Sequence, residues 1–400
     1  MKIAIVSDMH IGYERFYEDA YQQALRAMES AHEKADMVII PGDVFDKRAP
    51  KPEVMAQAVN IFMEMSRRKW PSKVVEVRGP EQARTDAPII AIPGTHERTA
   101  EGKENPLKVL ALAGLLVDAS ESTVIVQKGD EKVAVFGLGG LSEERVKPGL
   151  EELNPKPVDG AFNVFMFHQS TFEILPFSKE FIHNDDLPVG FDLYVDGHIH
   201  NKVEGTVHGK PFLIPGSTVL TQLKDKEQGR KGYILFDTQS RTHQFIEIDT
   251  RPFIFREIMA TNAKPGEISD LCEREISQAI NSHTTKPILR IQLTGTIAKG
   301  FTNSDMPLHA LQLKHADELF LEIDHSKLQA ADLQKDIEQL RENKLGDMPI
   351  RDLGMRMFAE QLREKGLGGE LPVQELFNIL SSAPNKEKAI KEAGSLLLGE

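Results

Sequence analysis

Short apolar runs rich in β-forming residues, several followed directly by an aspartate or a histidine, constrain this chain more than any other feature. Such runs predict buried strands, and stretches with apolar residues at helical spacing separate the early ones. The predicted strands are Lys2–Val6, Met37–Ile40, Ile89–Ile92, Val133–Phe136, Asn163–Phe167, Leu193–Val195, Phe212–Ile214, Gly232–Phe236 and Gln244–Ile248. Strands that alternate with helices early and then follow one another predict an α/β fold, a two-sheet sandwich with helices outside.

The acids and imidazoles that follow these strands are expected to meet at one edge of the fold, because the carboxyl ends of sheet strands converge on one rim. They are Asp8, His10, Asp43, His96, His168, His198 and His200. Glycines ahead of Asp43, His96 and His198 are expected to permit the tight turns that aim these side chains at the rim.

Side chains of this kind would repel one another at a shared rim unless a cation joined them. Mixed imidazole and carboxylate donors suit Mn, Fe or Zn better than Ca or Mg. The pattern therefore predicts a dinuclear metal site in which one carboxylate, with Asp43 favoured, bridges two ions. Such a pair activates hydroxide for attack at phosphorus.

Composition limits the classes of protein that remain. The net charge of −13 excludes a generally polycationic nucleic-acid coat protein, although a local basic stripe or a metal pair could still supply a positive field. A single cysteine, Cys272, excludes an internal disulfide and a multi-cysteine metal site. The longest apolar stretch, near Val109 to Val117, is too short to span a membrane, and the N-terminus lacks a signal-peptide pattern. We therefore expect a cytoplasmic protein with no membrane partner.

The distribution of motifs predicts three parts of the chain. Residues 1–250 hold the strands and the candidate site, and the motif density falls at Pro252. Residues 251–325 predict a small α/β capping domain with a helix over Glu267–Ile280. Residues 326–400 predict a charge-rich helical tail, whose helices are too short to be stable alone and must pack on something.

The residues at the strand ends form motifs that stand in a fixed order, Ser7-Asp-Met-His10, Gly42-Asp43, Gly94-Thr-His-Glu97, His168 and Gly197-His-Ile-His200. Over residues 1–250 this series resembles the calcineurin-like metallophosphoesterases. Within them the chain is most similar to the SbcD-type nucleases of DNA double-strand-break repair, the meiotic recombination eleven family, in its archaeal form. The narrower resemblance rests on His168-Gln169, on the run from Asp186 to His200, and on Ile214-Pro-Gly-Ser-Thr followed by Lys231-Gly-Tyr.

The resemblance implies a role for each motif position. Asp8, His10, Asp43 and His200 would hold the first metal, and Asp43, His168 and His198 the second. His96 would not be a ligand, but would stabilise the charge on the phosphorane or protonate the leaving oxygen. Thr95 stands where the family's asparagine supplies an amide oxygen to the second metal, with water or Glu97 as alternative donors. Asp46 stands where many relatives have a histidine near the DNA end. The implied cofactors are two Mn²⁺ ions, for which Fe, Zn or Mg could substitute.

The implied function is that of a metal-dependent DNA phosphodiesterase, an exo- and endonuclease that processes DNA ends in double-strand-break repair. Its implied partners are DNA ends, an SbcC-type coiled-coil ATPase and a second copy of the chain in a homodimer. The capping domain of residues 251–325 would contact the DNA, and the tail of residues 326–400 is the candidate segment for binding the ATPase. Lys47 and Arg48 follow the second motif and are candidate DNA contacts.

Two alternatives stay open. One is a phosphoesterase for small substrates, such as a cyclic nucleotide or a nucleotide sugar, and the module after Pro252 argues against it. The other is a non-catalytic scaffold subunit with a weakened metal site. Thr95 favours that alternative, whereas the otherwise full ligand set argues against it.

Overall fold

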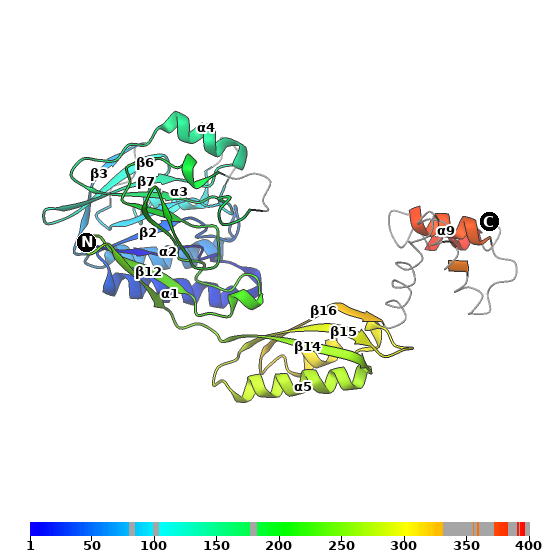
Figure 1. Ribbon diagram of the computed structural model, residues 1–400. Coiled ribbons are helices and arrows are strands. Elements are labelled where there is room, and N and C mark those ends of the chain that lie inside the picture. Colours follow the sequence, from blue (N-terminus) through cyan, green and yellow to red (C-terminus); the bar gives the residue numbers. More distant parts are fainter. Residues whose placement is uncertain are drawn as a thin grey trace. The chain divides into compact units, whose positions relative to one another are not determined.

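The computed structural model describes residues 1–79, 85–98, 104–176, 182–330, 355, 358–359, 372–382, 390–391 and 393–396. Two β-sheets lie face to face in the first part of the chain, with helices on their outer faces (Figure 1). This arrangement confirms the predicted two-sheet sandwich.

The first sheet has the strand order β13-β12-β1-β2-β4-β5. Its strands are β1 (Lys2–Ile5), β2 (Met37–Pro41), β4 (Ile89–Ile92), β5 (Val117–Asp118), β12 (Gly232–Asp237) and β13 (Thr242–Glu247). Within this sheet, the strands β1, β2, β4 and β5 run parallel to one another. Its outer face packs on α1 (Tyr17–Lys34), α2 (Pro52–Arg67) and α3 (Pro106–Leu112). Every residue of β2 is buried, as expected for a parallel strand that is covered on both faces.

The second sheet has the strand order β10-β11-β9-β8-β7-β6-β3. Its strands are β3 (Lys73–Arg78), β6 (Ser122–Lys128), β7 (Glu131–Leu138), β8 (Phe162–Phe167), β9 (Leu193–Asp196), β10 (Val203–Val207) and β11 (Lys210–Ile214). The strands β7, β8, β9 and β11 run parallel. Helix α4 (Glu143–Leu153) packs on its outer face through Val146 and Leu150.

The core between the sheets brings the carboxyl ends of both sets of parallel strands to one edge. Side chains such as Ile3 and Ile39 from the first sheet meet Val164 and others from the second, and all three are fully buried. At the edge, His168 Nδ1 after β8 lies 2.7 Å from the carbonyl oxygen of Pro41, the last residue of β2. Residues that follow strands of either sheet can therefore share one site.

Each predicted strand of the sandwich is present within two residues of its expected bounds, but the prediction missed β3, β5, β6 and β10 as well as α3 and α4. β3 lies at the end of its sheet and has only two half-buried positions among exposed ones, so it lacks the continuous apolar run of a central strand. β5 has only two residues, and the middle of β10 is exposed. Weak burial explains the omission of β3 and β10, and short length explains that of β5.

Beyond the sandwich, β14 (Phe253–Ala263), β15 (Ile288–Ile297) and β16 (Phe320–Ala330) form a three-stranded sheet. The helices α5 (Pro265–Asn281) and α6 (Leu308–Lys314) complete the predicted α/β pattern. The helical pattern expected from residue 326 onward is wrong for 326–330, because β16 continues beside β15 to Ala330.

The chain divides into two compact units. One comprises Met1–Arg256, Ile276–Arg290 and His315–Glu322, and the other comprises Glu257–Glu275, Ile291–Lys314 and Ile323–Glu400. The domain boundaries expected near 250 and 325 stay predictions.

In the predicted tail, α9 (Val373–Ser382) buries Leu376, whereas residues 331–354 lie outside the described part. Among the described residues, no helix combines the length and apolar character that a membrane span requires.

Candidate metal centre

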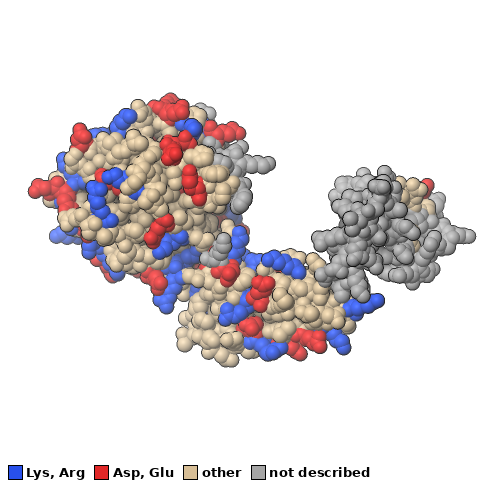
Figure 2. Space-filling model, in the orientation of Figure 1, with Lys and Arg blue, Asp and Glu red and all other residues tan. Residues whose placement is uncertain are grey.

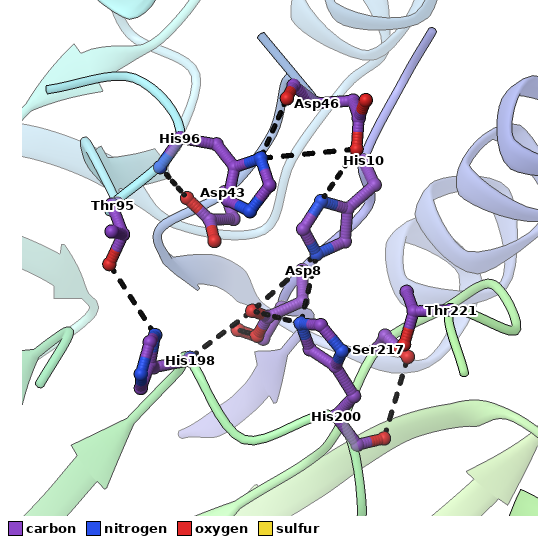
Figure 3. A network of polar contacts seen from close by, with 12 residues as sticks. Asp8, His10, Asp43, Asp46, Thr95, His96, His198, His200, Ser217 and Thr221 are labelled. Atoms are coloured by element: carbon purple, nitrogen blue, oxygen red, sulfur yellow. Dashed lines mark hydrogen bonds and ion pairs between the residues drawn. The ribbon is translucent and has the colours of Figure 1, made fainter. Parts of the chain in front are cut away.

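The predicted ligands lie together at the carboxyl edge of the two sheets, where Figure 3 shows Asp8, His10, Asp43, His198 and His200 around one space. Asp8 and His10 follow β1, and Asp43 follows β2. Thr95 and His96 follow β4, His168 follows β8, and His198 and His200 follow β9. Both sheets therefore contribute side chains to one site.

Four of these residues hold a left-handed backbone conformation that is unfavourable for residues other than glycine, with φ of 50° at Asp8, 47° at His10, 51° at Asp43 and 68° at His198. Neighbouring loops hold them there, because Asp8 N donates to Gly42 O at 3.2 Å and His10 N donates to Asp43 O at 3.0 Å. His198 N donates to Asp8 Oδ1 at 3.1 Å. Strain that clusters in this way is typical of functional sites.

The glycines beside the ligands permit close approach more than tight turns. Gly42 does have a φ of 95°, and a Cβ there would lie 2.3 Å from His168 Nδ1. Gly94 and Gly197 are not in the left-handed region, so their backbone conformation does not require glycine. A Cβ on Gly94 would lie 2.2 Å from Asp43 Oδ1, so packing excludes any larger residue.

Asp8, His10 and His200 form the first group of candidate ligands. His10 Nε2 and His200 Nε2 are 3.1 Å apart, and Asp8 Oδ1 lies 3.9 Å from the first and 3.7 Å from the second. Asp8 is fully buried, and burial raises the pKa of its carboxyl to about 6. A cation among these atoms would offset that burial penalty and would separate the two facing imidazole nitrogens.

Asp8, Asp43 and His168 form the second group. His168 Nε2 is 3.3 Å from Asp43 Oδ2, and both side chains are buried. Burial raises the pKa of Asp43, but the charge of His168 and its hydrogen bond outweigh burial and hold that pKa below its ordinary value. Asp8 belongs to both groups of candidate ligands, whereas Asp43 belongs only to the second. The expectation that Asp43 bridges the two ions therefore stays a prediction.

His198 completes the predicted second set of ligands. Its ring centroid is 5.3 Å from that of His168, and its Nδ1 is 3.4 Å from Thr95 Oγ1. Burial lowers the pKa of His198 to about 4 and that of His200 to about 2. Both imidazoles are therefore neutral at pH 7, which is the form that binds a metal ion.

His96 differs from the other imidazoles because 43% of its side chain is exposed. Its Nδ1 is 2.6 Å from the carbonyl oxygen of Asp46, so Nδ1–H can donate there and Nε2 is left for substrate. Asp46 Oδ1 also lies 3.5 Å from His10 Nδ1. Sequence reasoning gave Asp46 no part in orienting these imidazoles, although its place three residues after Asp43 was the available signal.

Glu97 is not placed to substitute for the family's asparagine. Its side chain is fully buried, and its two carboxylate oxygens accept hydrogen bonds from Phe45 N at 2.9 Å and from Gly94 N at 2.8 Å. It joins the loop of Asp43 to the loop of His96. Burial raises the pKa of Glu97 to about 8.

The two candidate DNA contacts, Lys47 and Arg48, are exposed in the loop that follows Asp46. Lys47 Nζ forms an ion pair with Glu14 Oε1 at 2.5 Å, so DNA would have to compete with that carboxylate. Their contact with phosphate stays a prediction.

The residues present fit divalent cations. The buried His168 Nε2 lies 3.3 Å from Asp43 Oδ2, and the Nε2 atoms of His10 and His200 face each other at 3.1 Å. Asp8 and Asp43 are buried carboxylates, which are costly unless they are paired or bind a metal. Imidazole with carboxylate is also a donor set that first-row transition metals prefer.

The substitution Thr95→Asn is expected to strengthen the second half of the site. It places an amide oxygen beside His198, where the threonine hydroxyl now lies 3.4 Å from Nδ1. We expect the Mn²⁺ concentration for half-maximal phosphodiester hydrolysis to fall several-fold, and a Mn²⁺ titration of the rate measures it. Thr123→Asn, at a half-buried threonine in β6, is the matched control. An unchanged Mn²⁺ titration in Thr95→Asn would mean that the threonine, or water, already completes the site.

Comparisons with known proteins agree with this geometry. The profile described as calcineurin-like phosphoesterase matches residues 1–202. The double-strand break repair protein MRE11 of Coprinopsis cinerea is 24% identical over 326 residues, which cover 68% of this chain and 44% of that protein.

Two archaeal relatives carry the name DNA double-strand break repair protein Mre11. The protein of Methanopyrus kandleri is 28% identical over 276 residues, which cover 62% of this chain and 57% of that protein. The protein of Sulfolobus acidocaldarius is 25% identical over 316 residues, which cover 74% of this chain and 76% of that protein. The chain thus spans about half the length of the fungal and the Methanopyrus relatives.

Proposed function

The chain belongs to the calcineurin-like phosphoesterase family, and from that premise we propose that it is a divalent-metal-dependent DNA phosphodiesterase that processes the ends of broken DNA. The observation that carries the proposal is the convergence of Asp8, His10, Asp43, His168, His198 and His200 at one rim. A binding or scaffold protein has no physical need for so many buried acids and imidazoles in one place.

Each side chain has a role in this proposal. Asp8, His10, His200 and Asp43 hold one cation, and Asp43 with His168 and His198 holds the other. Bound Mn²⁺, or Fe, Zn or Mg in its place, lowers the pKa of water and neutralises charge on the scissile phosphate. His96 stands at the exposed side, where its imidazole stabilises the developing charge or protonates the leaving oxygen.

DNA is the proposed substrate because the relatives that match most of this chain are named as double-strand break repair proteins. The distribution of surface charge is compatible with DNA binding, but positive charge does not dominate the face that Figure 2 draws. Figure 2 shows Lys and Arg interspersed with Asp and Glu on the face that it draws. The metal pair and exposed cations such as Lys47 and Arg48 would therefore supply the local attraction for phosphate.

Cleavage of linear duplex DNA with Mn²⁺, with Mg²⁺ and with chelator tests the proposal. We expect hydrolysis with Mn²⁺ and loss of it with chelator. A chain that hydrolyses only bis-p-nitrophenyl phosphate or cyclic nucleotides would be a small-substrate phosphoesterase. A chain that binds DNA without cleaving it under any of these conditions would be the scaffold subunit.

We propose three further properties on the same basis. The chain partners an SbcC-type coiled-coil ATPase, forms a homodimer and acts in the cytoplasm. Support for a second copy comes from α3, where Val109 and Leu112 are 46% and 59% exposed.

Truncation after Ala330 is expected to separate cleavage from partner binding. It keeps every proposed ligand and the whole of β16, so Mn²⁺-dependent cleavage of single-stranded DNA should persist. Co-purification with the ATPase and ATP stimulation should be lost, because the short amphipathic helices predicted after β16 would be the segments that dock on a partner helix. A truncated chain that binds the ATPase with unchanged affinity in a titration would place the docking surface elsewhere.

A further inference from the structure

A chain of hydrogen bonds leads away from His200 on the side opposite the cation space. His200 Nδ1 lies 2.5 Å from Thr221 Oγ1, and Thr221 Oγ1 donates to Glu227 Oε1 at 3.2 Å. A hydroxyl carries a single proton. Since the hydroxyl hydrogen is donated to the carboxylate, the hydroxyl oxygen must accept a hydrogen bond from His200 Nδ1–H.

Further contacts fix the middle of this chain. Gln222 N donates to Glu227 Oε2 at 2.8 Å, so both oxygens of the carboxylate are engaged. Tyr13 OH donates to the carbonyl oxygen of Thr221 at 2.8 Å, which ties that residue to the loop after β1. Neither Thr221 nor Glu227 can turn away without losing several bonds at once.

Lys231 closes the network from the other side. Its ammonium donates to Glu227 Oε1 at 3.4 Å, to Ser217 Oγ at 3.1 Å and to the carbonyl oxygen of His200 at 3.1 Å. Glu227 and Lys231 are only 5% and 7% exposed. A buried ion pair is weak evidence for stability, because apolar residues of similar size often serve as well or better. The position of the pair suggests another reason, because Lys231 contacts the backbone of His200 and Glu227 is joined to the His200 side chain through Thr221.

We infer that Thr221, Glu227 and Lys231 form a positioning relay that holds His200 with its proton on Nδ1 and its Nε2 lone pair directed at the cation space. The inference rests on the proposed metal-binding function. The Nε2 atom faces His10 Nε2 and Asp8 Oδ1, which are the other donors of that group. A ligating imidazole is commonly held by a partner on its second nitrogen, and loss of that partner costs about 10–100-fold in metal affinity.

Thr221→Val tests the relay because valine keeps the size of threonine and removes only the hydroxyl. The full-length chain is titrated with Mn²⁺ by calorimetry, without DNA. We expect one Mn²⁺ affinity to fall about 10–100-fold in Thr221→Val while the other is unchanged. Thr221→Ser, which keeps the hydroxyl, should retain wild-type binding. Thr218→Val is the matched control, because the buried Thr218 hydroxyl has no hydrogen-bond partner among the described residues.

A second measurement reports the tautomer directly. Imidazole ¹⁵N spectra of the metal-free chain, with His200 assigned by its loss in His200→Asn, should show Nδ1 protonated in the wild type and in Thr221→Ser. Thr221→Val should show a mixture of tautomers. A wild-type His200 protonated on Nε2 would overturn the relay, as would wild-type Mn²⁺ affinities in Thr221→Val. If the valine variant does not fold, the wild-type and serine spectra still decide. Failure of the wild type itself to bind Mn²⁺ would instead reject the proposed function.

Discussion

His96→Ala is expected to lower the rate of DNA cleavage by about 10²–10³ while Mn²⁺ content and DNA affinity stay at wild-type values. The imidazole is the half-exposed one at the rim, and its Nδ1 is already engaged by the Asp46 carbonyl oxygen. It can therefore act on the phosphate without holding a metal. Single-turnover cleavage, elemental analysis and a DNA-binding titration measure the three quantities.

His309→Ala is the matched control for this variant, since His309 is an exposed histidine of α6. It should leave all three quantities unchanged. Loss of Mn²⁺ from His96→Ala would show that His96 is a ligand, which its place near His10 and Asp46 would then explain.

Asp43→Asn is expected to abolish measurable cleavage and to remove at least one bound Mn²⁺. The amide can still accept the bond that His96 N now donates to Asp43 Oδ1 at 2.8 Å, so the loop should keep its shape. What the substitution removes is a buried charge 3.3 Å from His168 Nε2, on which both proposed cations depend. Cleavage assays and Mn²⁺ counting by elemental analysis measure the effect.

Asp196→Asn controls for the loss of a buried carboxyl at the same edge. Burial raises the pKa of Asp196 well above its ordinary value, which favours its uncharged form, and its Oδ1 accepts a bond from Gln169 N that an amide can also accept. We expect it to retain both Mn²⁺ ions. Full Mn²⁺ occupancy and cleavage in Asp43→Asn would mean that Asp43 is not a ligand.

Much of the site could be predicted from the sequence because each candidate ligand lies within a few residues of the end of a buried strand. Asp8, shortly after Lys2–Ile5, and His168, directly after Phe162–Phe167, are examples in which an apolar run gives way to polar residues. The carboxyl ends of parallel strands share an edge, so local pattern alone brings these residues together. The same rule explains why the two-sheet architecture was predictable.

The parts that escaped prediction depend on contacts between distant segments or on weak burial. Thr221 is 21 residues and Lys231 is 31 residues from His200, and no spacing rule joins them. The left-handed backbone at Asp8 is likewise imposed by neighbouring loops, in a conformation that aspartate tolerates better than most residues but that its presence does not predict. At the edge of the second sheet, the exposed and charged β3 gives too little apolar signal to be recognised.

Anomalous X-ray diffraction from crystals of the full-length chain grown with Mn²⁺ tests the central claim most directly. We expect two Mn²⁺ peaks at the carboxyl edge of the sheets, one among Asp8, His10 and His200, and one beside His168 and His198. No Mn²⁺ peak at that edge, with DNA cleavage nevertheless intact in the same preparation, would contradict it.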